Sequence, residues 1–130
     1  MDEQLMKHGA ISWSELMTSD VEAAKKFYGQ LFGWELEQAD VPEIEYTVVR
    51  SNGREIAGMM TLPPEAAGAP PNWGIYITVD DVDATAAKAE GLGAKLCVPP
   101  RDIPNVGRFC VMQDPQGAYI SAITYVQQQK

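Results

Sequence analysis

Apolar and polar residues alternate from Ile11 to Met17, and this period of two predicts a β-strand with two unlike faces. One face carries the odd-numbered residues Ile11, Trp13, Glu15 and Met17. The other carries Ser12, Ser14 and Leu16. The strand is therefore expected to lie half-buried, with its two faces in different surroundings.

The period then changes to that of a helix. Apolar residues recur at Val21, Ala24, Phe27, Tyr28 and Leu31, with lysines between them on the side facing water. Ser19 and Glu22 have the spacing of a capping box, which predicts the start of the helix. Gly33 is the expected end, because a left-handed residue after a helix costs glycine least.

Three further strands are predicted in this first unit, at 34–37, 44–50 and 55–62. Asn52-Gly53 between the last two predicts a tight hairpin. Four prolines and a glycine then fall between Pro63 and Pro71, a composition that predicts a stiff connector.

The same plan returns after the connector. A strand at 73–79 precedes a helix with the apolar stripe Val82, Ala86, Ala89 and Leu92. Asp80 with Asp83 is expected to cap this helix, and Gly91 and Gly93 to end it. A short strand at 95–98, an irregular loop at 99–107 and a final hairpin of strands 108–113 and 118–126 complete the unit.

The repeat is also visible in the letters, since Asp20-Val-Glu-Ala returns as Asp81-Val-Asp-Ala. Strands outnumber helices, and the order βαβββ occurs twice. We therefore expect an α+β fold in a single domain, residues 1–130, with modules at about 9–62 and 73–126 and a connector at 63–72. The seam between two such halves is the natural place for a pocket.

Charge and composition narrow the range of partners. The 130 residues carry a net charge of −8, and no cluster of Lys and Arg provides a footing for nucleic acid. There is no apolar run of about 18 residues for a membrane span, and the N-terminus lacks the features of a signal peptide. We expect a cytoplasmic protein with neither a nucleic-acid nor a membrane partner. In a reducing compartment, Cys97 and Cys110 are expected to be buried free thiols without chemistry.

The segments 20–34 (D-V-E-A-A-K-K-F-Y-G-Q-L-F-G-W), 79–84 (V-D-D-V-D-A), 92–94 (L-G-A) and 114–117 (D-P-Q-G) occur in a characteristic order. This ordered set resembles the vicinal oxygen chelate superfamily, which includes glyoxalase I, bleomycin-resistance proteins and extradiol dioxygenases. The resemblance implies that the two modules form a curled, barrel-like mixed sheet around a shared cavity. It also implies a divalent metal, held by the first and last strands of each module, and a homodimer, either side by side or with exchanged modules.

Transferring the metal-ligand positions to this chain gives Trp13, Ala57, Gly74 and Ser121, none of which has a side chain that suits the metal. A shift of two residues reaches Glu15 and Glu55 but no histidine. His8, the single histidine, precedes the first strand and is expected to be an exposed terminal residue. We therefore expect no metal and no other cofactor; a metal held by Glu15 or Glu55 is the alternative.

The same alternation predicts which side chains line the cavity and contact a ligand: Trp13, Glu15, Ala57, Met59, Gly74, Tyr76, Ser121 and Ile123. The set is mostly apolar, with one carboxylate and one phenol, as in many small-molecule pockets. Glu15 is the candidate catalytic residue, since a carboxyl group in an apolar cavity suits a general base. The alternative is an exposed or Arg-paired residue at a sheet edge.

Other side chains have two interpretations. Trp13, Trp34 and Trp73 either stack on a planar ligand or pack in the core. Arg101, Asp102 and Arg108 border the irregular loop and are candidates for gating the pocket.

Three functions compete. The first is metal-free binding of a small, partly apolar or aromatic molecule between the modules. The second is a metal-independent lyase or isomerase with Glu15 as general base, and the third is a metal-dependent glyoxalase- or dioxygenase-type enzyme with non-standard ligands. A structural or regulatory protein is also compatible with the sequence.

Overall fold

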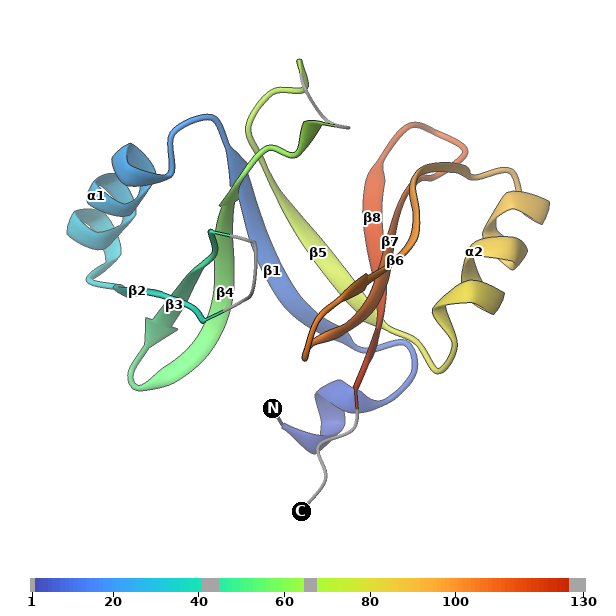
Figure 1. Ribbon diagram of the computed structural model, residues 1–130, viewed down its shortest axis with the longest axis horizontal. Coiled ribbons are helices and arrows are strands. Elements are labelled where there is room, and N and C mark those ends of the chain that lie inside the picture. The colour runs from blue at the N-terminus through green and yellow to red at the C-terminus, as the bar shows by residue number, and fades with distance from the viewer. Residues whose placement is uncertain (1, 41–44, 65–67, 127–130) are drawn as a thin grey trace. The chain divides into compact units, whose positions relative to one another are not determined.

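The computed structural model describes residues 2–40, 45–64 and 68–126. The chain divides into two compact units (Figure 1). We call residues 13–74 the first module and residues 1–12 with 75–130 the second module, and each is described by itself.

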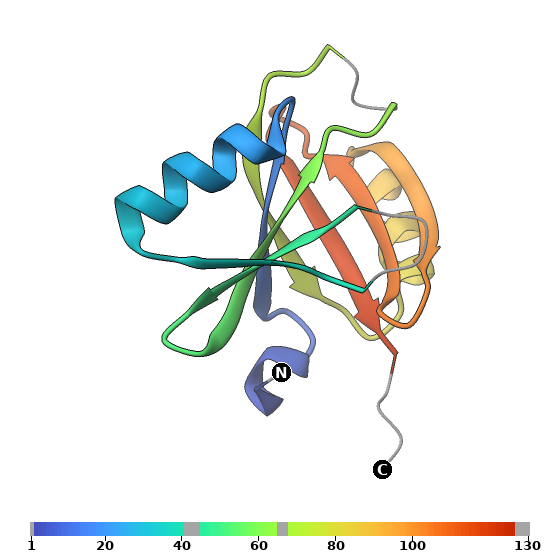
Figure 2. The ribbon, with the colours of Figure 1, turned by 60° about the vertical axis from the view of Figure 1, so that its left-hand side comes forward.

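The first module contains four strands, β1 (Ile11–Thr18), β2 (Glu35–Gln38), β3 (Thr47–Ser51) and β4 (Arg54–Thr61). Their order is β2-β3-β4-β1, and Figure 2 shows them with the helix of this module. The first and last strands, β1 and β4, are parallel, whereas the other two pairs are antiparallel.

Helix α1 (Val21–Phe32) begins at a different residue from the one predicted. The cap is Asp20, whose side chain accepts a hydrogen bond from the Ala23 N–H at 3.0 Å. The capping box expected from Ser19 and Glu22 is therefore wrong: aspartate is an equally good cap, and it begins the repeated motif. Gly33 ends the helix as predicted, with a φ of 71°.

The core of the first module lies between α1 and one face of its sheet. Its buried residues are Leu16, Val49, Ala57 and Met59, against which Val21, Ala24 and Tyr28 of the helix pack. The predicted stripe is only partly correct, because Phe27 is 60% and Leu31 56% exposed. The helix thus buries one side of its apolar surface and leaves the other uncovered.

The second module opens with a short 3-10 helix, η1 (Glu3–Met6). Its sheet has the order β5-β8-β7-β6, built from β5 (Asn72–Thr78), β6 (Lys95–Ile103), β7 (Gly107–Gln113) and β8 (Tyr119–Tyr125). Again the first and last strands, β5 and β8, are parallel. The module therefore repeats the plan of the first.

Helix α2 (Val82–Gly91) is capped by Asp81, which accepts from the N–H groups of Asp83 and Ala84. The predicted cap, Asp80, is wrong: its own N–H donates to His8 Nδ1 at 3.0 Å, and both side chains are exposed. Val82 and Ala86 are buried in the core as predicted, whereas Leu92 lies beyond the helix and is 70% exposed.

The predicted loop at 99–107 is also wrong in its first half, since β6 continues to Ile103 and pairs with β7. The register is irregular between Leu96 and Arg101, where Pro99 and Pro100 have no N–H to donate. Because β6 is the last strand in the order of its module, prolines are tolerated there.

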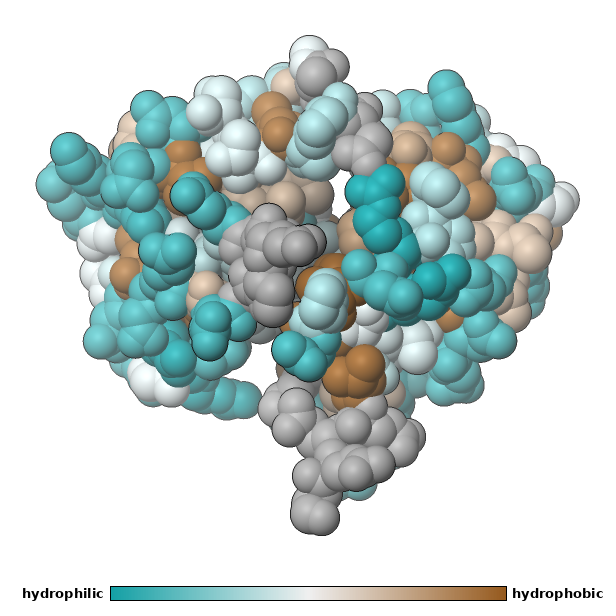
Figure 3. All heavy atoms as spheres, viewed as in Figure 1, coloured by the Kyte–Doolittle hydropathy of each residue, from teal (hydrophilic) through white to brown (hydrophobic). Residues whose placement is uncertain are grey.

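The α+β class and the βαβββ order of both modules are confirmed. The shared cavity stays a prediction. No helix of the described residues is long and apolar enough to cross a membrane. On the face in Figure 3, hydrophilic side chains predominate and hydrophobic ones reach the surface in separate areas.

The two aspartate caps generate a stability prediction. Replacing Asp20 or Asp81 by Ala should lower the free energy of unfolding by about 1 kcal/mol each, because backbone N–H groups lose their acceptor. Urea denaturation monitored by circular dichroism measures the change. Ser19→Ala is the control and should be nearly neutral; an equal loss there would contradict the assignment.

Candidate functional site

The register between β1 and β4 decides which side chains share a face in the first module. Ser14 lies opposite Ala57, Glu15 opposite Gly58 and Leu16 opposite Met59. Residues opposite one another point to the same side of a sheet. Ala57 and Met59 therefore face α1, and the expectation that they share the face of Trp13 and Glu15 is wrong.

The reason is a difference between the two hairpins. In the first module, Asn52-Gly53 forms a two-residue turn, and a bulge between Val49 and Arg50 leaves Ile56 as an extra residue in β4. In the second module, five residues separate the paired Gln113 and Tyr119. The residue at a fixed distance after the turn glycine thus lies on one face of the sheet in the first module and on the other face in the second. The reason is that a shift of one residue reverses the side to which a side chain points.

Glu15 accepts the last hydrogen bond of a chain of side chains on the face opposite α1. Its side chain is buried, with an exposed fraction of 6%. Tyr46 Oη donates to Glu15 Oε2 at 2.8 Å, and Trp13 Nε1 donates to Tyr46 Oη at 2.7 Å. The carboxylate therefore has a phenol as a hydrogen-bond donor, and the phenol is oriented by an indole.

The missing side chain of Gly58 allows this arrangement. A Cβ atom on Gly58 would overlap the hydroxyl end of Tyr46, so the phenol occupies the space that a side chain would fill. Our sequence reasoning missed Tyr46. The available signal was the alternation of β3: Val48 pairs with Gly58, and Tyr46, two residues earlier, belongs to the same face.

In the second module, Tyr76 lies opposite Ser121 and Thr78 opposite Ile123. Tyr76, Ser121 and Ile123 therefore share a face, as the alternation predicts, and the Tyr76 ring lies 6.3 Å from that of Phe109. Gly74, in β5, has Asn72 Oδ1 at 4.0 Å from the position of a Cβ. Their role as ligand contacts stays a prediction.

The donor set of the expected metal positions does not fit a metal. The register places Gly58, and not Ala57, opposite Glu15, and glycine has no side-chain atom that could bind a metal. Glu55, the other candidate, forms an ion pair with Arg50 at 3.0 Å. Within the described ranges, no three His, Cys, Asp or Glu side chains gather closely enough to hold a metal.

Each module also has an open pocket of its own. That of the first module has a volume of about 590 Å³ and is lined mainly by the rings of Tyr28, Phe32, Trp34 and Trp73. Trp34 packs against the core, as the second interpretation of the tryptophans predicts, and also lines this pocket.

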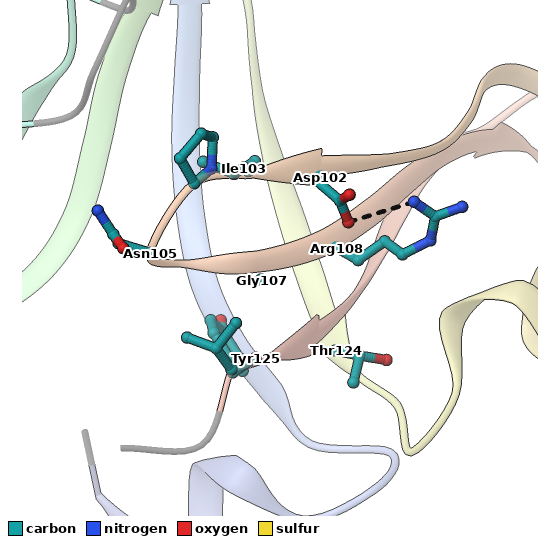
Figure 4. A pocket seen from close by; sticks show the side chains of 9 residues that line it. Asp102, Ile103, Asn105, Gly107, Arg108, Thr124 and Tyr125 are labelled. Carbon is teal, nitrogen blue, oxygen red and sulfur yellow. Dashed lines mark hydrogen bonds and ion pairs between the residues drawn. The ribbon is translucent and has the colours of Figure 1, made fainter. Parts of the chain in front are cut away.

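The pocket of the second module, of about 360 Å³, lies at the β6–β7 hairpin (Figure 4). Arg108 donates there to Asp102 at 3.2 Å and, through Nε, to Asp83 at 2.9 Å. Arg108 and Asp102 are therefore occupied with ion pairs, and the gating role suggested for them stays untested.

Several titratable groups of the second module have shifted pKa values, and each shift has a clear cause. The hydrogen bond from Arg108 lowers the pKa of Asp83. Hydrogen bonds from the backbone N–H groups of Ala118 and Gln116 lower the pKa of Asp114, in the turn before β8. Burial raises the pKa of the Cys110 thiol, which is free and buried as predicted; Cys97 is also free but only half-buried, so its predicted burial is wrong.

Residues 10–121 match the family described as the Glyoxalase/Bleomycin resistance protein/Dioxygenase superfamily. The chain belongs to this superfamily. The resemblance inferred from the motifs is thus confirmed.

Curated relatives of the superfamily are substantially longer than this chain. CFP32 of Mycobacterium bovis, whose name carries the word glyoxylase, is 38% identical over 122 residues, covering 93% of this chain and 46% of its own length. The anthracycline biosynthesis protein DnrV of Streptomyces peucetius is 31% identical over 123 residues, covering 85% of this chain and 45% of its own. The chain thus spans less than half of either relative.

Solved structures of the superfamily share the fold at low identity. Methylmalonyl-CoA epimerase of Mycobacterium tuberculosis matches with a TM-score of 0.65 and 15% identity, covering 98% of this chain and 93% of that chain. A variant of the Streptomyces coelicolor methylmalonyl-CoA epimerase, in complex with 2-nitronate-propionyl-CoA, gives 0.66 and 19%, covering 93% and 100%. At these identities the similarity shows the fold alone.

The space over Gly58 can be tested directly. Gly58→Ala should displace Tyr46 from Glu15 and lower the free energy of unfolding by about 1–3 kcal/mol, because the added methyl group overlaps the phenol. Gly91→Ala is the matched control, since open space surrounds its Cβ position at the end of α2. Equal stability of Gly58→Ala and the unaltered protein in urea denaturation would contradict the packing.

The lowered pKa of Asp83 predicts a loss of stability in acid. The contribution of ionised Asp83 to the free energy of unfolding is fully present above its ordinary pKa of 3.8. It is lost as the pH falls through the lower pKa of Asp83 in the folded state. Arg108→Gln should therefore make the free energy of unfolding fall less steeply as the pH drops below 3.8. Arg54→Gln, an exposed change of the same charge, is the control and should retain the steeper fall.

Proposed function

We propose that the chain binds a small, partly apolar or aromatic molecule on the face that carries Trp13 and Glu15, without the metal of the superfamily. The observation that carries this proposal is the buried Glu15 carboxylate held by Tyr46 at 2.8 Å. The proposal includes Tyr76, Ser121 and Ile123, on the corresponding face of the second module, as ligand-contacting residues.

A buried carboxylate supports binding because it is costly to keep. Removing a charged group from water is unfavourable unless hydrogen bonds replace the lost hydration. Tyr46 supplies such a bond, and the Trp13 indole beside it offers an apolar surface. Together they favour a ligand with an aromatic or apolar body and a hydrogen-bond donor directed at Glu15.

The donor set supports the metal-free form of the proposal. The positions where the superfamily resemblance implies metal ligands, Trp13, Ala57, Gly74 and Ser121, offer no carboxylate or imidazole, and neither does Gly58, which lies opposite Glu15. The proposed ligand is therefore held by hydrogen bonding and apolar contact. The expected homodimer and cytoplasmic location stay predictions.

A second candidate is a metal-independent lyase or isomerase. The hydrogen bond from Tyr46 fixes the position of the Glu15 carboxylate, as a general base that removes a proton from an acidic carbon requires. Glu15→Gln should then abolish turnover of an activated carbon acid while sparing its binding. Full activity of that variant would rule out the role.

The binding proposal predicts a measurable loss of affinity. The probes are small aromatic amines, hydroxyquinolines and hydroxyanthraquinones, the last because one relative is named for anthracycline biosynthesis. Glu15→Gln should weaken binding of a responding probe tenfold or more, since a hydrogen bond to a charged group is worth about 1.5–3 kcal/mol. Titration calorimetry measures the affinity, and Glu90→Gln, at an exposed position of α2, is the control.

Two results would contradict the proposal. The first is that no probe of the panel shows saturable binding to the protein. The second is elemental analysis that finds one divalent metal per chain, lost in Glu15→Gln; this would favour the metal-dependent alternative. We expect binding to be unchanged by a chelator.

A further inference from the structure

The open pocket of the first module lies on the helix side of its sheet. Ser14 and Ala57, which line it, are opposite one another in the register and share the face that packs against α1. Glu15 and Gly58 point to the other side. This pocket, which we call the aromatic groove, is therefore separate from the site proposed for Glu15.

Four aromatic rings form the walls of the aromatic groove in fixed relative positions. Tyr28 stacks against Trp34 with centroids 5.8 Å apart and an interplanar angle of 24°. Trp73 stands across both, at 84° to Tyr28 and 74° to Trp34. Trp73 Nε1 also donates to Tyr28 Oη at 3.1 Å, so the wall is held without a ligand.

The chemistry of the lining selects an uncharged ligand. Among the described residues that line the groove, none has a charged side chain; their polar side-chain groups are the hydroxyls of Ser14 and Tyr28 and the indole N–H groups of Trp34 and Trp73. A charged ligand would lose hydration and find no partner of opposite charge. The net charge of −8 further disfavours anions.

Size and shape select a planar ligand. The groove has a volume of about 590 Å³ and is open to solvent, so a bound ligand would be covered on one side. Two indoles nearly perpendicular to one another offer one ring face for stacking and one for an edge contact. The bulge at Ile56 places Ile56 and Ala57 together in the lining, and the small Ala57 leaves depth at this point.

We propose that the aromatic groove is a second ligand site, which binds a planar, uncharged aromatic molecule against the rings of Trp34 and Trp73, with a hydrogen bond to Ser14 or Tyr28. This site does not depend on the proposal for Glu15. It also gives a role to Trp73, which is 41% exposed and belongs to neither core cluster of the described residues.

The test uses N-phenyl-1-naphthylamine, an uncharged aromatic probe whose fluorescence rises in apolar surroundings. We expect saturable binding of one probe per chain and quenching of tryptophan emission. Trp73→Ala should weaken binding at least tenfold by removing one wall, and Ser14→Phe should abolish it by filling the groove. Circular dichroism verifies that each variant is folded.

Two control variants test whether the probe binds in the aromatic groove and nowhere else on the chain. Phe27→Ala removes a ring of α1 that is more exposed than Trp73 and does not line the groove, and should change affinity less than twofold. Glu15→Gln should also leave probe binding unchanged, so failure of one proposal is distinguishable from failure of the other. The assignment would be overturned if Phe27→Ala weakened probe binding as much as Trp73→Ala, or if neither Trp73→Ala nor Ser14→Phe weakened it.

A second copy of the chain is the competing occupant. Sedimentation of the unaltered protein and of Trp73→Ala, over a range of concentrations, distinguishes the two. A dimer that dissociates in the variant, together with no probe binding to the unaltered protein, would show that the groove is an interface and would overturn the proposal. Unchanged mass with lost probe binding would support it.

Discussion

Parallel pairing between the first and last strand of each module is the constraint on which the remaining structure depends. Antiparallel neighbours can be joined by a short turn, whereas a parallel pair needs a crossover. In both modules that crossover contains the helix, which consequently covers one face of its own sheet. The pairing thus separates a helix-covered face from the opposite face that carries Glu15 or Tyr76, and it determines which side chains belong to each.

Much of this plan could be predicted from sequence because it depends on local patterns. The strand at Ile11, the stop at Gly33 and the Asn52-Gly53 hairpin each follow from residues close together in the chain. The errors arose where two local signals compete. Ser19 and Asp20 are both good caps, and only the direction of the chain decides between them.

The candidate site was less predictable because its geometry depends on register. The bulge at Ile56 moves Ala57 to the helix-covered face, and nothing in the apolar character of these residues marks it. Tyr46 approaches Glu15 only through the pairing of β3 with β4. The sequence shows that Glu15 lies on a strand. The hydrogen-bond donor to its carboxylate, Tyr46, lies 31 positions away along the chain, so local patterns do not reveal it.

The network through Tyr46 has a direction. An indole N–H can only donate, so Trp13 must occupy an acceptor lone pair of the Tyr46 oxygen. The single phenolic hydrogen then remains for Glu15, and the order of donation runs from Trp13 to Tyr46 to Glu15. The indole thus fixes the orientation of the phenolic hydrogen and leaves the Tyr46 hydroxyl as a donor toward Glu15.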